Sequence, residues 1–144
     1  KLKIKNMEKI GLTIPYKSAF TDVLFNIAAQ GFEYIKVSYS GSGDDGCIDD
    51  VELIPTGCIS IKDNEVLWKE NKKVEHSEPN EELNDIIRNK SYDHVLNDAE
   101  DWWNNGGGGG TLYICTLDGT YHGDHYVNET ITHDSTLTGK FGDI

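Results

Sequence analysis

The chain has 144 residues, a length typical of one domain, and its three Trp, seven Tyr and four Phe supply the large apolar groups that disordered acidic chains lack. Its 25 Asp and Glu outnumber its 13 Lys and Arg, so the formal net charge is -12. Such a charge repels nucleic-acid phosphates and anionic lipids, which excludes an ordinary basic-groove nucleic-acid binder and a basic membrane-surface protein.

Neither a membrane span nor a cysteine framework is indicated. The sequence contains no run of about eighteen apolar residues, which a membrane-spanning helix needs. Cys47, Cys58 and Cys115 have no CxxC spacing and indicate neither a disulfide framework nor a zinc knuckle. We therefore expect a protein of the reducing cytoplasm.

The first predicted element is an amphipathic helix between Ser18 and Gln30. Its apolar residues recur at steps of three and four: Phe20, Val23, Leu24, Ile27 and Ala28. Gly31 stands where helices commonly end on a left-handed residue. The alternation over 34–39 then predicts a half-buried strand that leads into the Gly-rich segment 41–46.

Three short antiparallel strands are predicted next, around 51–53, 59–61 and 66–68, because apolar and polar residues alternate there. Asp63-Asn64, between the last two, is typical of a hairpin turn. The polar segment 70–80 is expected to be an exposed connection.

The segment 81–104 has the composition of one long helix but carries two apolar sets. At about 100° per residue, the set around Leu83 and Ile87 points roughly 160° away from the later set, which contains Val95, Leu96, Ala99, Trp102 and Trp103. One straight helix cannot bury both sets on one side. We therefore predict two helices, broken at 89–91, with Ser91 as the N-cap of the second helix and Asn104-Asn105-Gly106 at its end.

Five glycines at 106–110 offer no side chain for packing, and a hairpin follows them. The alternation over 112–117, the turn signal Asp118-Gly119 and the return strand 120–127, with a continuation at 129–132, predict that hairpin. The C-terminal residues show no clear pattern. The order of elements predicts an α+β fold with an antiparallel sheet of about five strands packed with two or three helices.

The negative charge is concentrated in two segments. Residues 41–61 contain five acidic and no basic side chains, and residues 74–110 contain nine acidic and two basic side chains. Residues 1–40 are net basic. The acidity is therefore more specific than a uniform solvating coat.

The first candidate site is the segment after the first strand. Its glycines let backbone amides approach a ligand closely, and the carboxylates of Asp44, Asp45, Asp49 and Asp50 suit a hard divalent cation. Ser42 is a further candidate binding residue of this segment. The spacing fits neither an EF-hand loop nor a P-loop. The other interpretations are docking of a protein partner and an acidic surface turn.

The second candidate site is the Trp pair with the amides behind it: Trp102, Trp103, Asn104 and Asn105. Paired Trp side chains beside flexible glycines can stack on a planar ligand or insert into a partner. The structural alternative is that one Trp is buried and the other is partly exposed, because neighbouring helical residues point in different directions.

The third candidate site is on the strand that ends the hairpin. His122 and Asp124 share one face of that strand and His125 points to the other, so this segment alone is a poor three-ligand site. Together with Asp44, Asp45 or Asp49 across the sheet, His122 and Asp124 would form a mixed metal site or an acid-base pair. The alternative is a surface strand with ordinary histidines.

Two short motifs, Gly41-Ser42-Gly43-Asp44-Asp45-Gly46 and Trp102-Trp103-Asn104-Asn105-Gly106, occur in the order seen in a known group of proteins. In this respect the chain resembles a family of small bacterial and mobile-element proteins of unknown function, with a Gly-Ser-Gly-Asp-x-Gly loop and a Trp-x-Asn-Asn-x-Gly turn. The resemblance implies that the two motifs meet in space and that the chain comes from a phage or plasmid accessory gene.

The leading hypothesis for function is a non-enzymatic interaction protein, such as a phage- or plasmid-encoded inhibitor, that needs no cofactor. Its acidic segments would occupy a basic surface of a host protein that handles nucleic acid, without binding nucleic acid or a membrane itself. The alternatives are a hydrolase that depends on a divalent cation and a nucleotide or small-molecule binding module built on the Asp-rich loop. Sheet edges that can pair between chains leave an oligomer compatible with the sequence.

Overall fold

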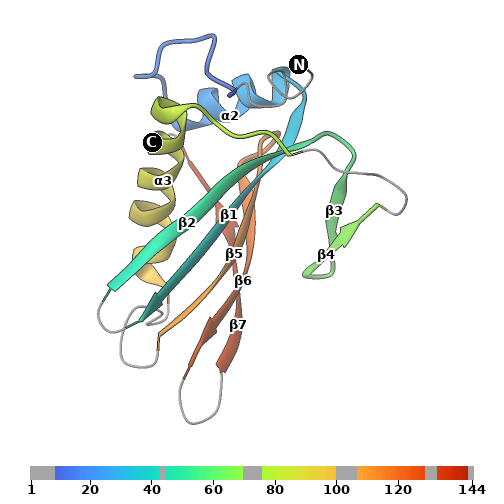
Figure 1. Cartoon of the computed structure of the whole chain (residues 1–144). Coiled ribbons are helices and arrows are strands. Elements are labelled where there is room, and N and C mark those ends of the chain that lie inside the picture. Colours follow the sequence, from blue (N-terminus) through green and yellow to red (C-terminus); the bar gives the residue numbers. More distant parts are fainter. Residues whose placement is uncertain (1–8, 43–44, 70–75, 100–106, 129–132, 143–144) are drawn as a thin grey trace, which may run out of the picture.

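The computed structural model describes residues 9–42, 45–69, 76–99, 107–128 and 133–142 (Figure 1). In chain order they form helix α2 (Phe20–Ala29), strands β1 (Phe32–Ser42), β2 (Asp45–Pro55), β3 (Ile59–Lys62) and β4 (Glu65–Trp68), helix α3 (Glu81–His94), the 3-10 turn η1 (Leu96–Asp98), and strands β5 (Gly108–Cys115), β6 (Thr120–Val127) and β7 (His133–Lys140).

The large sheet has five antiparallel strands in the order β2-β1-β5-β6-β7, and β3 and β4 form a separate two-stranded ribbon. Figure 1 shows α3 and α2 on one side of the large sheet and the ribbon of β3 and β4 on the other. The α+β fold with a five-stranded antiparallel sheet is therefore confirmed. We call the side of the sheet without helices the helix-free face.

Apolar side chains are buried on both faces of the sheet. The main core lies between the sheet and the helices and includes Phe20, Ile27, Ile35, Leu83 and Leu112. A smaller cluster, formed by Ile54, Cys58, Ile59 and Tyr113, lies under the ribbon at one end of the helix-free face. The ribbon thus covers that end of the face through the smaller cluster.

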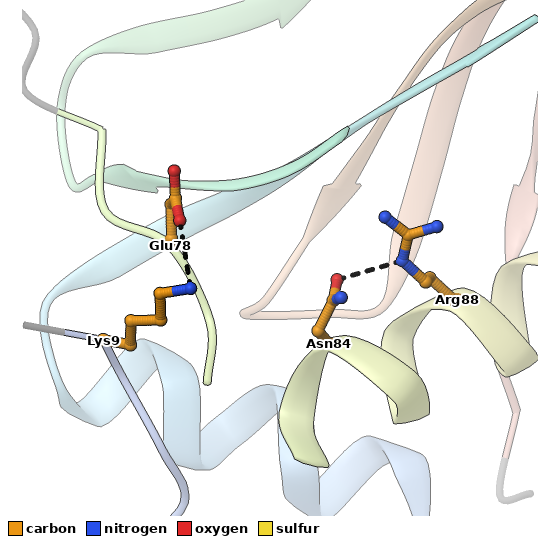
Figure 2. A network of polar contacts seen from close by, with 4 residues as sticks. All are labelled: Lys9, Glu78, Asn84 and Arg88. Carbon is orange, nitrogen blue, oxygen red and sulfur yellow. Dashed lines mark hydrogen bonds and ion pairs between the residues drawn. The ribbon is translucent and has the colours of Figure 1, made fainter. Parts of the chain in front are cut away.

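Helix α2 is confirmed where the apolar stripe predicts it, with Phe20, Val23, Leu24 and Ile27 buried. Gly31 has φ 102°, a left-handed conformation that favours glycine, and the chain turns there into β1. Before α2, Lys9 forms an exposed ion pair with Glu78 at 3.6 Å, which links the two segments that precede the helices (Figure 2).

The predicted break in the second helical region is wrong by about one turn. Asn80 caps α3 by accepting a hydrogen bond from the Leu83 N–H at 2.9 Å, and the helix then runs through 89–91 to His94. Ser91 is therefore a fully buried residue inside the helix rather than an N-cap. The change of phase is accommodated after Val95 by the three-residue turn η1, and Ala99 is already extended, so no second α-helix forms up to that residue.

The glycine run does not end the regular structure, because Gly108, Gly109 and Gly110 belong to β5 in the middle of the sheet. Gly110 pairs with Tyr39 on β1, and Gly109 pairs with Tyr126 on β6. A Cβ at position 110 would approach the Asp124 carbonyl oxygen and lie 2.7 Å from the Tyr39 hydroxyl. Gly109 and Gly110 are thus positions at which neighbouring tyrosines fill part of the space of a side chain.

The strands after the Asp-rich segment also differ in part from the prediction. β2 has 11 residues and pairs with β1, while β3 and β4 pair with each other. The turn between β3 and β4 is confirmed, since Asp63 and Asn64 both have positive φ, at 54° and 62°, as a tight hairpin requires. Within 70–80, Ser77 bonds to both backbone groups of Leu53 on β2, and residues 70–75 lie outside the described part.

The hairpin of β5 and β6 is confirmed, with a connection of four residues in which Gly119 has φ 77° and its N–H bonds to the Cys115 carbonyl. β7, which the sequence does not predict, pairs with β6 along its whole length. The predicted continuation at 129–132 lies outside the described residues.

Candidate functional site

The strand register aligns residues of neighbouring strands in rows across the helix-free face. One row runs from β2 to β7 through Asp50, Ser38, Thr111, Asp124 and Thr136. Ser38 and Thr111 are small and polar, and Asp50 and Asp124 are exposed on either side of them. This row has no large apolar residue, so it forms a polar strip that contains two carboxylates.

The next row, towards the ribbon, is Glu52, Lys36, Tyr113, His122 and Thr138. Glu52 Oε1 lies 3.8 Å from Lys36 Nζ and 3.1 Å from His76 Nδ1. Trp68 of the ribbon stacks on His76 and lies edge-on to Tyr113. Burial, followed by the charges of Asp124 and Glu52, raises the pKa of Tyr113 and keeps its phenol neutral.

His122 neighbours Asp124 on the same face of β6. It is almost completely buried, with 4% of its surface exposed. Its Nε2 atom is 3.3 Å from Oδ1 of Asp124, an ion pair when His122 is protonated. The alignment does not make a hydrogen bond, and Nε2 has no hydrogen-bond partner among the described residues. The Asp124 side chain is 67% exposed, so its carboxylate remains available at the surface.

Asp49 and Asp50 project from an irregularity in β2, because the register with β1 shifts between Ser38 and Tyr39. Asp49 is the extra residue, as in a β-bulge, and its Oδ2 accepts a hydrogen bond from Ser40 Oγ at 2.6 Å. Partial burial and then the charge of Glu52 raise the pKa of Asp50. The bulge therefore places two consecutive carboxylates on the helix-free face.

Helix α3 supports this bulge from the outer edge of β2. The Ile48 N–H donates to the Tyr92 hydroxyl at 2.6 Å, and Arg88 Nη1 donates to the Ile48 carbonyl at 2.7 Å. Arg88 Nε also donates to Asn84 Oδ1 at 3.2 Å, which orients the guanidinium (Figure 2). Sequence reasoning did not identify Arg88 or Tyr92, because their partners are backbone groups of a distant strand.

His125 points to the other side of the sheet, as alternation along the strand predicts. Its Nδ1 lies 2.8 Å from the Tyr39 hydroxyl, and both side chains are buried on the helix side. Burial, followed by the charge of Asp124, raises the pKa of Tyr39, so this hydroxyl stays protonated. His125 therefore has a structural role beneath the helices and is separated by the sheet from His122.

The structure brings only part of the predicted site together. Asp50 and Asp124 share a face and a row, but with β1 and β5 between them they are three strand spacings apart, about 14 Å. Asp49, next to Asp50 on β2, is thus too far from His122 and Asp124 to share one cation with them. Among the described residues, no group of three His, Cys, Asp or Glu side chains is arranged to hold a metal ion.

The remaining predicted site residues, or their side chains, lie outside the described part of the chain. Asp44, Trp102, Trp103, Asn104 and Asn105 lie outside the described residues, as do the side chains of Ser42 and Asp45. Whether the two short motifs meet therefore stays a prediction. Residues 108–110, just after the second motif, do lie beside β1, and Gly108 pairs with Gly41, the first residue of the first motif.

No family model, curated protein or solved structure matches the chain. Within the described residues, no helix is both long and apolar enough to span a bilayer.

Proposed function

We propose that the chain is a non-enzymatic interaction protein that binds a basic protein surface through its helix-free face. The observation that carries this proposal is that the register gathers carboxylates from three strands on that face. They belong to Asp49, Asp50 and Glu52 on β2, Asp124 on β6 and Asp134 on β7. We call these five residues the acidic face.

The charge balance of this face favours a cationic partner. Lys36 and Lys140 are the cations that the described strands place there, and Lys36 is already paired with Glu52 at 3.8 Å. Asp49, Asp50, Asp124 and Asp134 are all exposed. An incoming lysine or arginine would therefore meet unneutralised carboxylates, and complementary charge would speed the encounter.

The width of the acidic face suits a broad partner. Between the carboxylates lie Ser38, Ser40 and Thr111, and five strands span about 19 Å from β2 to β7. Tyr126 lies over Gly109 in this region and keeps 37% of its surface exposed, which makes it a suitable aromatic anchor. A broad, negative surface of this kind matches a protein surface that ordinarily carries a nucleic-acid phosphate backbone.

The test compares two variants that remove equal charge. D49N/D50N/D124N/D134N neutralises four residues of the acidic face, and D22N/E82Q/D85N/D93N neutralises four exposed acidic residues on α2 and α3. Both are used, with the wild type, to capture partners from a lysate at low salt, and a captured basic protein is then purified for affinity measurements. We expect the face variant to lose affinity about tenfold or more, the helix variant to retain it, and salt or competing nucleic acid to release the partner.

Equal affinity for both variants would show that the charge of the chain acts without regard to position. A partner that tolerates high salt, or that binds nucleic acid and this chain simultaneously, would contradict the proposed occupation of a nucleic-acid surface.

A further inference from the structure

The outer edge of β7 is an open strand edge. In the described part of the chain β7 pairs with β6 on one side and with no strand on the other. Its described side chains, from Asp134 to Lys140, are exposed except for Leu137, which packs partly against the main core. Unpaired edges of this kind add strands from other chains unless they are blocked, and β7 contains neither a proline nor a register shift.

The hydrogen-bond pattern identifies which residues face outwards along this edge. The Phe141 N–H donates to the Gly119 carbonyl at 2.9 Å, immediately beyond the paired ends of β6 and β7. Because hydrogen-bonded pairs alternate along an antiparallel ladder, residues 135, 137 and 139 also bond to β6. The backbone groups that point away from β6 therefore belong to Asp134, Thr136, Thr138 and Lys140.

We propose that two copies of this chain associate by antiparallel pairing of their β7 strands about a two-fold axis at Leu137. In that register Asp134 of each copy faces Lys140 of the other, and Thr136 faces Thr138. All four outward residues of each strand are then in hydrogen-bonded pairs, and the strand is self-complementary in charge. A shift by two residues in either direction loses both Asp–Lys pairs.

The two faces of the strand support the same register. Asp134, Thr136, Thr138 and Lys140 lie on the helix-free face, where opposite charges and paired threonines are favourable cross-strand neighbours. Leu137 meets its own copy on the helix side, where it extends the apolar contact. The inference does not depend on the proposed function, but such pairing would place both acidic faces on one side of a continuous ten-stranded sheet.

A charge-swap experiment tests this pairing in the full chain. Association of the wild type, D134K, K140D and the double variant D134K/K140D is measured by sedimentation velocity over a wide concentration range. Each single variant places like charges opposite each other twice per dimer, so we expect about tenfold weaker association or more. The double variant restores both pairs with reversed polarity and should associate like the wild type.

Mixing the two single variants sharpens the test. D134K carries lysine at both positions and K140D carries aspartate at both, so the two proteins are complementary to each other although neither matches itself. We expect heterodimers in the mixture and monomers in each separate sample.

E65K on β4 is the matched control, because it changes the net charge by the same amount as D134K and its site is exposed outside the large sheet. It should leave association unchanged. A monomeric wild type at all concentrations, or single variants that associate as strongly as the wild type, would overturn the proposal. Loss of association in the double variant would overturn the register.

Discussion

The ring of Tyr39 on β1 lies across Gly110 on β5, its direct partner in the sheet, and fills the space that a side chain at 110 would need. Two further tyrosines face glycines in the same way: Tyr126 lies opposite Gly109 and Tyr121 opposite Gly139. Three cross-strand Tyr–Gly pairs thus occur in a sheet whose central strand begins with glycines. The pairing explains how a glycine run can serve as a strand.

Replacing Gly110 by alanine should therefore be strongly destabilising. The new Cβ would approach the Asp124 backbone oxygen, which cannot move without disturbing β6, and the Tyr39 hydroxyl. We expect G110A to lower the free energy of unfolding by about 3 kcal/mol, the upper part of the usual range for overpacking. Urea denaturation monitored by circular dichroism measures this change. G142A is the control, because no atom lies within 4 Å of a Cβ there; a similar loss in both variants would contradict the Tyr–Gly explanation.

The effect of replacing Ser91 on the free energy of unfolding distinguishes a Ser91 inside α3 from a Ser91 that caps a second helix. Its hydroxyl is buried within α3 and has no hydrogen-bond partner among the described residues. S91A removes this unsatisfied group and introduces a better helix former, so we expect the free energy of unfolding to rise by about 1 kcal/mol.

The true N-cap supplies the comparison. N80A removes the acceptor of the Leu83 N–H and should cost about 1 kcal/mol. If Ser91 were the cap that the sequence suggests, S91A would be destabilising by a similar amount. Thermal and urea unfolding of both variants therefore decides between the two positions of the helix boundary.

The ionised carboxylate of Asp50 should lower the free energy of unfolding at neutral pH. Partial burial and the charge of Glu52 raise the pKa of Asp50 above its ordinary value of 3.8, so the folded state binds the proton more tightly than the unfolded state. The ionised group is therefore unfavourable above the raised pKa, and this cost disappears as the pH falls below the ordinary value. D50N should accordingly be more stable than the wild type at pH 7.

The same pair of proteins contains an internal control. The difference in melting temperature between D50N and the wild type should shrink as the pH is lowered through the raised pKa and vanish below about pH 3.8. A difference that persists at low pH would assign the effect to packing or hydrogen bonding instead of charge.

Local patterns in the sequence were sufficient for some elements and not for others. The stripe of Phe20, Val23 and Ile27 identifies α2, and Asp63-Asn64 identifies the turn between β3 and β4. In both cases the signal lies in residues close together in the sequence. The antiparallel α+β architecture follows from the order of such elements.

The elements that the sequence does not predict have one feature in common: they are stabilised by residues far away in the sequence. Gly109 and Gly110 have no side-chain periodicity, and the tyrosines that complete them come from β1 and β6. β7 is mostly polar on both faces, so alternation does not reveal it, and its pairing with β6 alone makes it a strand.

The candidate site was predictable in its residues but not in its geometry. The sequence singles out Asp49, Asp50 and Asp124 by composition, and alternation places His122 beside Asp124. The pair Asp49 and Asp50 on β2 is separated from His122 and Asp124 on β6 by strands β1 and β5. This separation follows only from the strand order.

Tyr92, Arg88 and Ser77 form hydrogen bonds with backbone groups on the outer side of β2: the Tyr92 hydroxyl accepts from Ile48 N–H, Arg88 donates to the Ile48 carbonyl, and Ser77 exchanges two bonds with Leu53. At Ile48 and Leu53 the β2 border is therefore already bonded to the chain's own residues, while among the described residues no strand pairs with the outer side of β7. Strand addition is therefore favoured at β7 over β2, because a strand arriving at β2 would first have to displace the contacts at Ile48 and Leu53. Growth of the pair into a fibre would carry that additional cost at each step.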